Sequence, residues 1–143
     1  MSKDYSNQTR IWSDTSMLKS ISNPSEEAYE IKHKSDELTF FGAPDQPDYA
    51  TIFITIYPAK TVIELKSLKL YFQQFRNMII SYERLLKVVY QDLLSIYKPV
   101  RLRIVMELNP RGGLSSRLTK DSDWAILGGK EEFRDWLGQK DEW

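Results

Sequence analysis

Residues 49–57, YATIFITIY, constrain the fold most, because they alternate between two faces that are both largely apolar or aromatic. Side chains two residues apart lie on the same face of a strand. One face therefore carries Ala50, Ile52, Ile54 and Ile56, and the other carries Tyr49, Thr51, Phe53, Thr55 and Tyr57. Such a pattern indicates a strand that meets protein on both faces.

The next segments predict a hairpin and two helices. Residues 61–67 read as a second strand after a short turn, which predicts a hairpin with residues 49–57. Apolar residues then recur every three or four positions in 67–78 and again in 81–96. This period is typical of helices with one buried face, and Pro99 ends the second.

The remaining segments return to strands. Residues 101–108 alternate and predict a third strand, the sequence PRGG at 110–113 predicts a turn, and residues 114–119 could form a fourth strand. Residues 130–138 read as a short amphipathic helix. The order strand–strand–helix–helix–strand–strand predicts an α+β fold, an antiparallel sheet with two helices on one face.

The chain divides into a polar N-terminal arm at 1–35, expected to have little regular structure, and a single domain at 36–143. Two helices cover only one face of a sheet. The face with Phe53 and Tyr57 must therefore find other cover, which a homo-oligomer would supply.

The composition excludes several kinds of site. The 143 residues contain no cysteine and one histidine, His33, which excludes disulfides and thiolate chemistry and disfavours zinc, so we expect no metal. Twenty basic residues balance twenty acidic ones, which gives no clear nucleic-acid signal. No apolar run is long enough for a membrane span, and the N-terminus lacks the apolar region of a secretory signal. We expect a cytoplasmic protein, with His33 exposed to solvent.

Five motifs occur in order along the chain: QPD at 46–48, ELKSLKLYF at 64–72, FRN at 75–77, Glu83, and PRGG at 110–113. Together they resemble the QueF-type 7-cyano-7-deazaguanine reductases, members of the tunnelling fold to which GTP cyclohydrolase I belongs. The resemblance implies sheets closed into barrels in a pentameric or decameric homo-oligomer, with ligand sites between subunits. It also implies reduction of a nitrile to an amine with NADPH, in queuosine biosynthesis, through a thioimide formed by a cysteine.

The resemblance assigns roles to residues of this chain. Asp48 matches the acid, and the nucleophile position seven residues earlier is Phe41. Glu83 matches the glutamate that holds the base, and Tyr82 stands where the family has a histidine. The positions that match the cofactor-binding motifs are Glu64, Lys66, Ser67, Lys69, Arg111, Gly112 and Gly113.

Each of these residues has a plain structural alternative. Glu83 could form a surface ion pair with Lys87, four residues along the helix. Asp48 could be a turn or strand-entry residue. Lys66 and Lys69 could lie on a solvated helix start, although a helix N-terminus would itself favour an anion. The glycines at 112 and 113 are expected to form a tight turn.

Three functions remain open. Phenylalanine cannot attack a nitrile, so the first is a diverged protein that binds a 7-deazaguanine or related purine-like base at a subunit interface, without thioimide chemistry. The second is an NADPH-dependent nitrile reductase that uses a cysteine-independent route. The third is a catalytically silent structural subunit of an oligomer.

Overall fold

The computed structural model describes residues 3–4 and 13–123 as a mixed α+β fold, which confirms the predicted class. Its long elements are β3 (Ile31–Ala43), β4 (Gln46–Tyr57), α1 (Leu65–Gln73), α2 (Tyr82–Tyr97), β7 (Arg101–Arg111) and β8 (Leu114–Asp121). Its short elements are β1 (Lys3–Asp4), β2 (Ser20–Ser22), β5 (Thr61–Ile63), the 3-10 helix η1 (Gln74–Asn77) and β6 (Met78–Ile79). The short strands make the order more complex than the six elements predicted.

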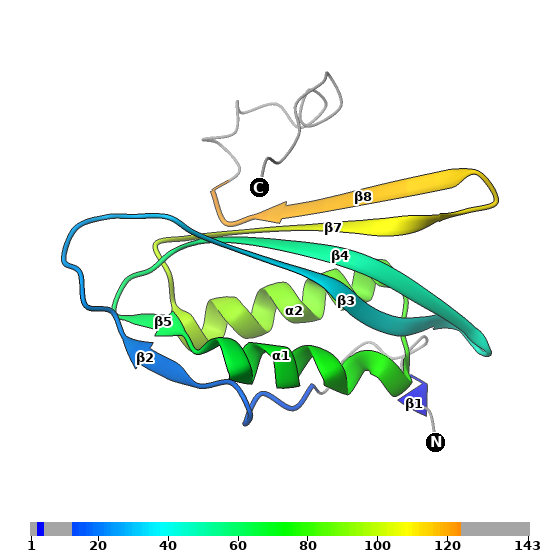
Figure 1. The fold of residues 1–143 in the computed structure, drawn as a ribbon, viewed down its shortest axis with the longest axis horizontal. Helices are drawn as coiled ribbons and strands as arrows, with labels where there is room; N and C mark the ends of the chain where they lie inside the picture. The colour runs from blue at the N-terminus through cyan, green and yellow to red at the C-terminus, as the bar shows by residue number, and fades with distance from the viewer. Residues whose placement is uncertain (1–2, 5–12, 124–143) are drawn as a thin grey trace.

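Strand β4 lies inside a six-stranded sheet of order β1-β6-β3-β4-β7-β8. Its antiparallel neighbours are β3 and β7, and Ile54 is opposite Ile104 on β7. Strand β6 pairs with β3 in parallel at one position only, Phe41 with Ile79. Both long helices lie on the same face of this sheet (Figure 1), as predicted.

The core lies between that face and the two helices. Ala50, Ile52, Ile54 and Ile56 are all buried there, so the predicted inner face of residues 49–57 is confirmed. Helix α2 contributes the buried side chains Leu85, Leu86, Val88, Val89, Tyr90, Leu93 and Tyr97. The side chain of Ser81 caps its start, and Lys98, in the left-handed conformation, ends it.

The hairpin predicted between residues 49–57 and 61–67 is wrong. Both edges of β4 are occupied by β3 and β7, and β5 pairs instead with β2 in a separate two-stranded sheet. The partner of β4 in a hairpin is β3, through a tight turn in which Asp45 has a φ of 62°. Helix α1 starts at Leu65, two residues earlier than expected.

The N-terminal segment holds more regular structure than expected. Strand β3 begins at Ile31, so the boundary placed at residue 35 falls inside it, and Leu18 is buried in the core. Residues 31–36 read IKHKSD, and on the face toward the helices Ile31 is followed by the polar side chains of His33 and Ser35, so no apolar period continues along the strand. His33 is half-buried, not exposed as predicted.

Some expectations are not tested by the described residues. The helix expected at 130–138 lies outside them. Phe53 and Tyr57 on the second face of the sheet are partly buried. Within residues 3–4 and 13–123, neither helix is long and apolar enough to cross a lipid bilayer.

Candidate functional site

The β3–β4 hairpin and the start of α2 meet at one end of the molecule. Phe41, near the end of β3, pairs with Ile79, and its carbonyl oxygen accepts a hydrogen bond from the amide of Ile80 at 2.8 Å. Ser81 then caps α2, so Tyr82 and Glu83 occupy its first turn. The residue that pairs with Phe41, Ile79, comes three positions before Tyr82 and four before Glu83, the two candidate base-binding residues.

Asp48 lies across the hairpin from this strand end. It is half-buried and opposite Phe40, and its carboxylate occupies the space beside Gly42. A Cβ atom at Gly42 would lie 2.1 Å from Oδ2 of Asp48, far inside van der Waals contact. Glycine at position 42 thus lets the carboxylate approach the β3 backbone directly.

Phe41 and Asp48 are adjacent in space but belong to opposite faces of the hairpin. Neighbouring residues of a strand point to opposite faces. Asp48 shares a face with Phe40 and Gly42, whereas Phe41 pairs with Pro47 on the other face. The residue at the nucleophile position therefore does not face the candidate acid in this hairpin.

The first turn of α2 presents two different side chains. Tyr82 is partly buried and packs against the core, whereas Glu83 is exposed. No ion pair joins Glu83 to Lys87 among the described residues, so the surface pair considered above is not seen. A carboxylate in a first helical turn is stabilised by the helix dipole and remains available to a ligand.

Two of the predicted cofactor residues at the start of α1 have structural partners. The Glu64 carboxylate caps the helix by accepting hydrogen bonds from the amides of Ser67 at 2.9 Å and Lys66 at 3.1 Å. Ser67 is buried, donates its hydroxyl hydrogen to the Glu64 carbonyl and accepts a bond from the Lys19 amide. Lys66 and Lys69 are exposed. The side-chain carboxylate of Glu64 therefore accepts the helix-start amide hydrogens that could otherwise bind an anionic ligand.

The predicted cofactor residues are not all brought together within one chain. Tyr97 is the last residue of α2, and its hydroxyl donates a hydrogen bond to the carbonyl of Lys19. The amide of Lys19 donates to Ser67 at the start of α1. The start of α1 therefore lies beside the end of α2. Burial raises the pKa of this tyrosine. Tyr82 and Glu83 are at the other end of α2, and its 16 residues span about 24 Å.

Gly112 and Gly113 form the β7–β8 turn, with φ values of 58° and 81°, which confirms the turn predicted there. Arg111 is the last residue of β7 and pairs with Leu114. This turn lies at the same end of the molecule as the β3–β4 turn (Figure 1). It is therefore far from the start of α1.

A groove of about 480 Å³ lies between β3 and α1. Its lining includes Lys69, the half-buried His33, and two residues to which the sequence assigned no role, Phe72 and Arg76. Burial lowers the pKa of His33. The spacing of Lys69, Phe72, Gln73 and Arg76 at i, i+3, i+4 and i+7 could have indicated this shared helix face.

The described residues contain no group of three or more His, Cys, Asp or Glu side chains that could hold a metal ion.

Comparisons with known proteins place the chain in a family. A family model described as QueF-like protein matches residues 47–124, more than half of the chain, and Phe41 lies just outside that match. The NADPH-dependent 7-cyano-7-deazaguanine reductase of Rhodopirellula baltica is 37% identical over 91 residues, which cover 63% of this chain and 75% of the relative. The protein of the same name from Thermomicrobium roseum is 38% identical over 104 residues, 71% of this chain and 81% of the relative. That from Gloeobacter violaceus is 44% identical over 68 residues, 48% of this chain and 50% of the relative. The resemblance stated from the motifs is thus confirmed, and the chain belongs to the QueF-like family.

Proposed function

We propose that this protein binds a 7-deazaguanine base at the end of the molecule where the β3–β4 hairpin meets the start of α2, and that it does so without thioimide chemistry. The observation that carries the proposal is the pairing of Phe41 with Ile79, because it brings the end of β3 to the short segment that leads into Tyr82 and Glu83. Relatives of this chain are named as 7-cyano-7-deazaguanine reductases, which supplies the ligand class.

Glu83 has the chemistry to recognise such a base. A guanine-like edge carries a ring N–H and an exocyclic amine side by side, and a carboxylate accepts both hydrogen bonds at once. Glu83 is exposed, in the first turn of α2. Tyr82 beside it adds an aromatic ring and a hydroxyl that is able to donate to a ligand carbonyl.

The thioimide route lacks its nucleophile. A thiolate attacks the nitrile carbon in that route, and Phe41 has no atom that could do so. The hairpin adds a second obstacle, since residue 41 and Asp48 belong to opposite faces. A nucleophile at position 41 would therefore not share a face with Asp48.

We further propose that the base site is completed by a second copy of the chain in a barrel-like homo-oligomer. Among the described residues, β3 pairs with β4 along one edge, while its other edge meets β6 only at Phe41. Among the described residues no strand lies on this edge at residues 33–40, so a strand of another copy could pair there.

Calorimetric titration with 7-cyano-7-deazaguanine tests the base site. We expect wild-type protein to bind and Glu83→Gln to bind about 10- to 150-fold more weakly, because hydrogen bonds to a charged group contribute about 1.5–3 kcal/mol. Glu26→Gln is the matched control, because Glu26 is also exposed and lies in the loop between β2 and β3. Equal affinities for the two variants would contradict the assignment of Glu83.

A second candidate is reduction of the nitrile with NADPH by a cysteine-independent route. The names of the relatives, and the half-buried Asp48 beside the β3 backbone, favour it. When bound, NADPH would supply the hydride. The assay is the loss of NADPH absorbance in the presence of the nitrile, with Asp48→Asn as the variant. Steady consumption that Asp48→Asn reduces at least tenfold would support this candidate, and none at all would exclude it.

A further inference from the structure

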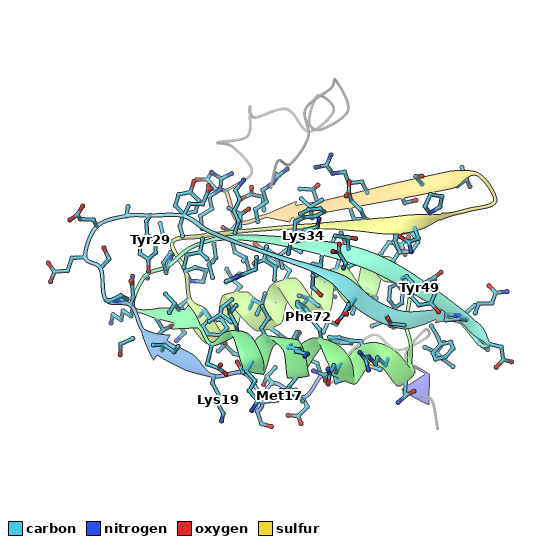
Figure 2. All side chains as sticks on the ribbon, in the orientation of Figure 1. Met17, Lys19, Tyr29, Lys34, Tyr49 and Phe72 are labelled. Atoms are coloured by element: carbon cyan, nitrogen blue, oxygen red, sulfur yellow. The ribbon has the colours of Figure 1, made fainter. Side chains whose placement is uncertain are left out.

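The second face of the six-stranded sheet, which points away from the helices, is buried at its centre. Figure 2 shows Lys34 on this side of the sheet and Phe72 on the other, between α1 and the strands. Val105 pairs with Phe53 on the second face and lies outside the core between sheet and helices, yet it is only 1% exposed. The side chain of Asp121, on the same face, is 0% exposed. This burial is typical of a sheet face that meets protein.

The apolar centre of the second face is bordered by cations. The ammonium of Lys34 lies 5.6 Å from the ring centroid of Phe53. The guanidinium groups of Arg101 and Arg103 lie 2.9 Å and 3.5 Å from the same carboxylate oxygen of Asp121. These last three residues form what we call the arginine cluster. Two guanidinium groups that share one carboxylate in a partly buried place favour a partner that brings further carboxylates.

The C-terminal segment, residues 124–143, has the composition of such a partner. It reads WAILGGKEEFRDWLGQKDEW, with five acidic residues, three basic residues and three of the four tryptophans of the chain. In the helix that the sequence predicts at 130–138, Phe133, Trp136 and Leu137 recur at i, i+3 and i+4 and so share one side. An acidic segment with an aromatic side complements a basic surface with an apolar centre.

The chain leaves β8 at a point from which this segment can reach the second face. The amide of Asp123 donates a hydrogen bond to the Asp121 carboxylate at 2.9 Å, so the backbone passes the arginine cluster as β8 ends. From β8 across β7 to β4 there are two strand spacings, roughly 10 Å in total. Residues 124–129 span up to about 20 Å when extended, and a nine-residue helix after them is roughly 13 Å long. The connection is therefore long enough, and the predicted helix would cover the width of three strands.

We propose that residues 130–138 pack as a helix on the second sheet face of their own chain, with the apolar side of the helix against Phe53 and Val105. Its carboxylates then lie toward the arginine cluster. The family model match ends at residue 124, so this cover belongs to an extension of this chain and not to the matched domain. The inference goes beyond the proposed base site, and it leaves the edge of β3 open to another copy of the chain.

Chemical crosslinking of the full chain tests the assignment, because the wild-type sequence contains no thiol. We expect a short bismaleimide to join Thr55→Cys and Arg134→Cys within one chain, since Thr55 is opposite Arg103 on the second face. The matched control is Lys87→Cys with Arg134→Cys, because Lys87 is exposed on α2, which covers the other face. Intact mass spectrometry of the products distinguishes a link within one chain from a link between two chains.

The thiol of Thr55→Cys alone gives a second measurement. Its reaction with a maleimide should become about tenfold faster or more in the Trp136→Ser background, because a packed segment must open before a covered thiol can react. Ile21→Ser, at an exposed apolar residue of β2, is the control and should leave the rate within about twofold. Circular dichroism verifies that each variant is folded.

Three results would overturn the assignment. A link between two chains would assign the second face to another copy, and no link at all, or equal yields for the test and control pairs, would show that the segment does not pack there. An unchanged maleimide rate in Trp136→Ser would show that this side chain does not cover Thr55. None of these measurements uses a base, so their failure would leave the calorimetry of Glu83→Gln unaffected.

Discussion

Replacing Gly42 by alanine tests the central contact of the candidate site. The added Cβ would lie 2.1 Å from Oδ2 and 3.3 Å from Cγ of Asp48. The nearest atom belongs to a side chain and not to the backbone, and Gly42 is not among the glycines with positive φ. We therefore expect Asp48 to rotate away while the hairpin itself persists.

The expected loss of stability is small. Moving a side chain off its preferred rotamer costs about 0.5–1.5 kcal/mol, and replacing glycine by alanine returns about 0.4–1 kcal/mol through the unfolded chain. The free energy of unfolding should consequently change by no more than about 1 kcal/mol, as measured by urea denaturation. Binding of 7-cyano-7-deazaguanine should nevertheless fall to the level of Asp48→Asn, because the carboxylate is displaced in one variant and neutralised in the other.

A double-mutant cycle identifies the cause. Once Asp48 is replaced by alanine, the space beside residue 42 is empty, and Gly42→Ala should then be neutral or slightly stabilising. Additive effects of the two substitutions would refute the contact. A loss of 3 kcal/mol or more in Gly42→Ala alone would show that backbone, and not the carboxylate, fills the space.

Three further predictions concern other parts of the structure. Tyr71→Phe should lower the free energy of unfolding by about 1.5–3 kcal/mol, because the buried hydroxyl of Tyr71 donates a hydrogen bond to Asp92 at 2.5 Å. The control is Tyr49→Phe on the surface, which should change the free energy of unfolding by less than about 0.5 kcal/mol in the same urea titration. Burial lowers the folded pKa of His33 below the usual value near 6.5, so the unfolded chain takes up the proton more readily and stability should fall as the pH drops below about 6.5. His33→Gln should flatten that dependence in urea titrations between pH 7 and 5, and an unchanged slope would contradict this reasoning. Phe41→Cys should give no covalent adduct with 7-cyano-7-deazaguanine by mass spectrometry, because the sulfur would belong to the face opposite Asp48, and an adduct of the expected mass would refute the hairpin geometry.

The fold was predictable where burial leaves an apolar period. Residues 49–57 and 81–96 have such periods, and both elements formed close to the predicted bounds. Strand β3 was missed because His33 and Ser35 face a groove that is only partly covered, so polar side chains are tolerated on the inner face. The hairpin error had another cause, since pairing depends on which strand edges are already occupied, and no local pattern records that.

The site was predictable as a set of motifs but not as a geometry. The motifs identified the family, yet they could not show that Glu64 caps α1 or that Ser67 is buried by the N-terminal segment. The burial of Ser67 is a tertiary fact, because its hydroxyl accepts a hydrogen bond from the amide of Lys19, 48 residues away. The cap is local, but it was missed because the helix was expected to begin at residue 67, after Glu64. The spacing could have placed Arg76 on one helix face with Lys69 and Phe72, but no local pattern shows that this face lies against β3.

The two faces of the β3–β4 hairpin explain why the missing cysteine cannot be treated as a single substitution. A register shift between Phe41 and Ala43 makes Gly42 the extra residue of a bulge, and this residue is the one beside the Asp48 carboxylate. Bulges redirect the side chains near them, so the face on which residue 41 lies depends on the bulge as well as on the residue itself. In a hairpin suited to a nucleophile, the side chain of residue 41 would have to lie on the same face as Asp48. In this hairpin the Asp48 carboxylate lies beside the backbone of Gly42 instead. The position of the Asp48 carboxylate therefore depends on glycine at residue 42, and a thiol at position 41 would not change that.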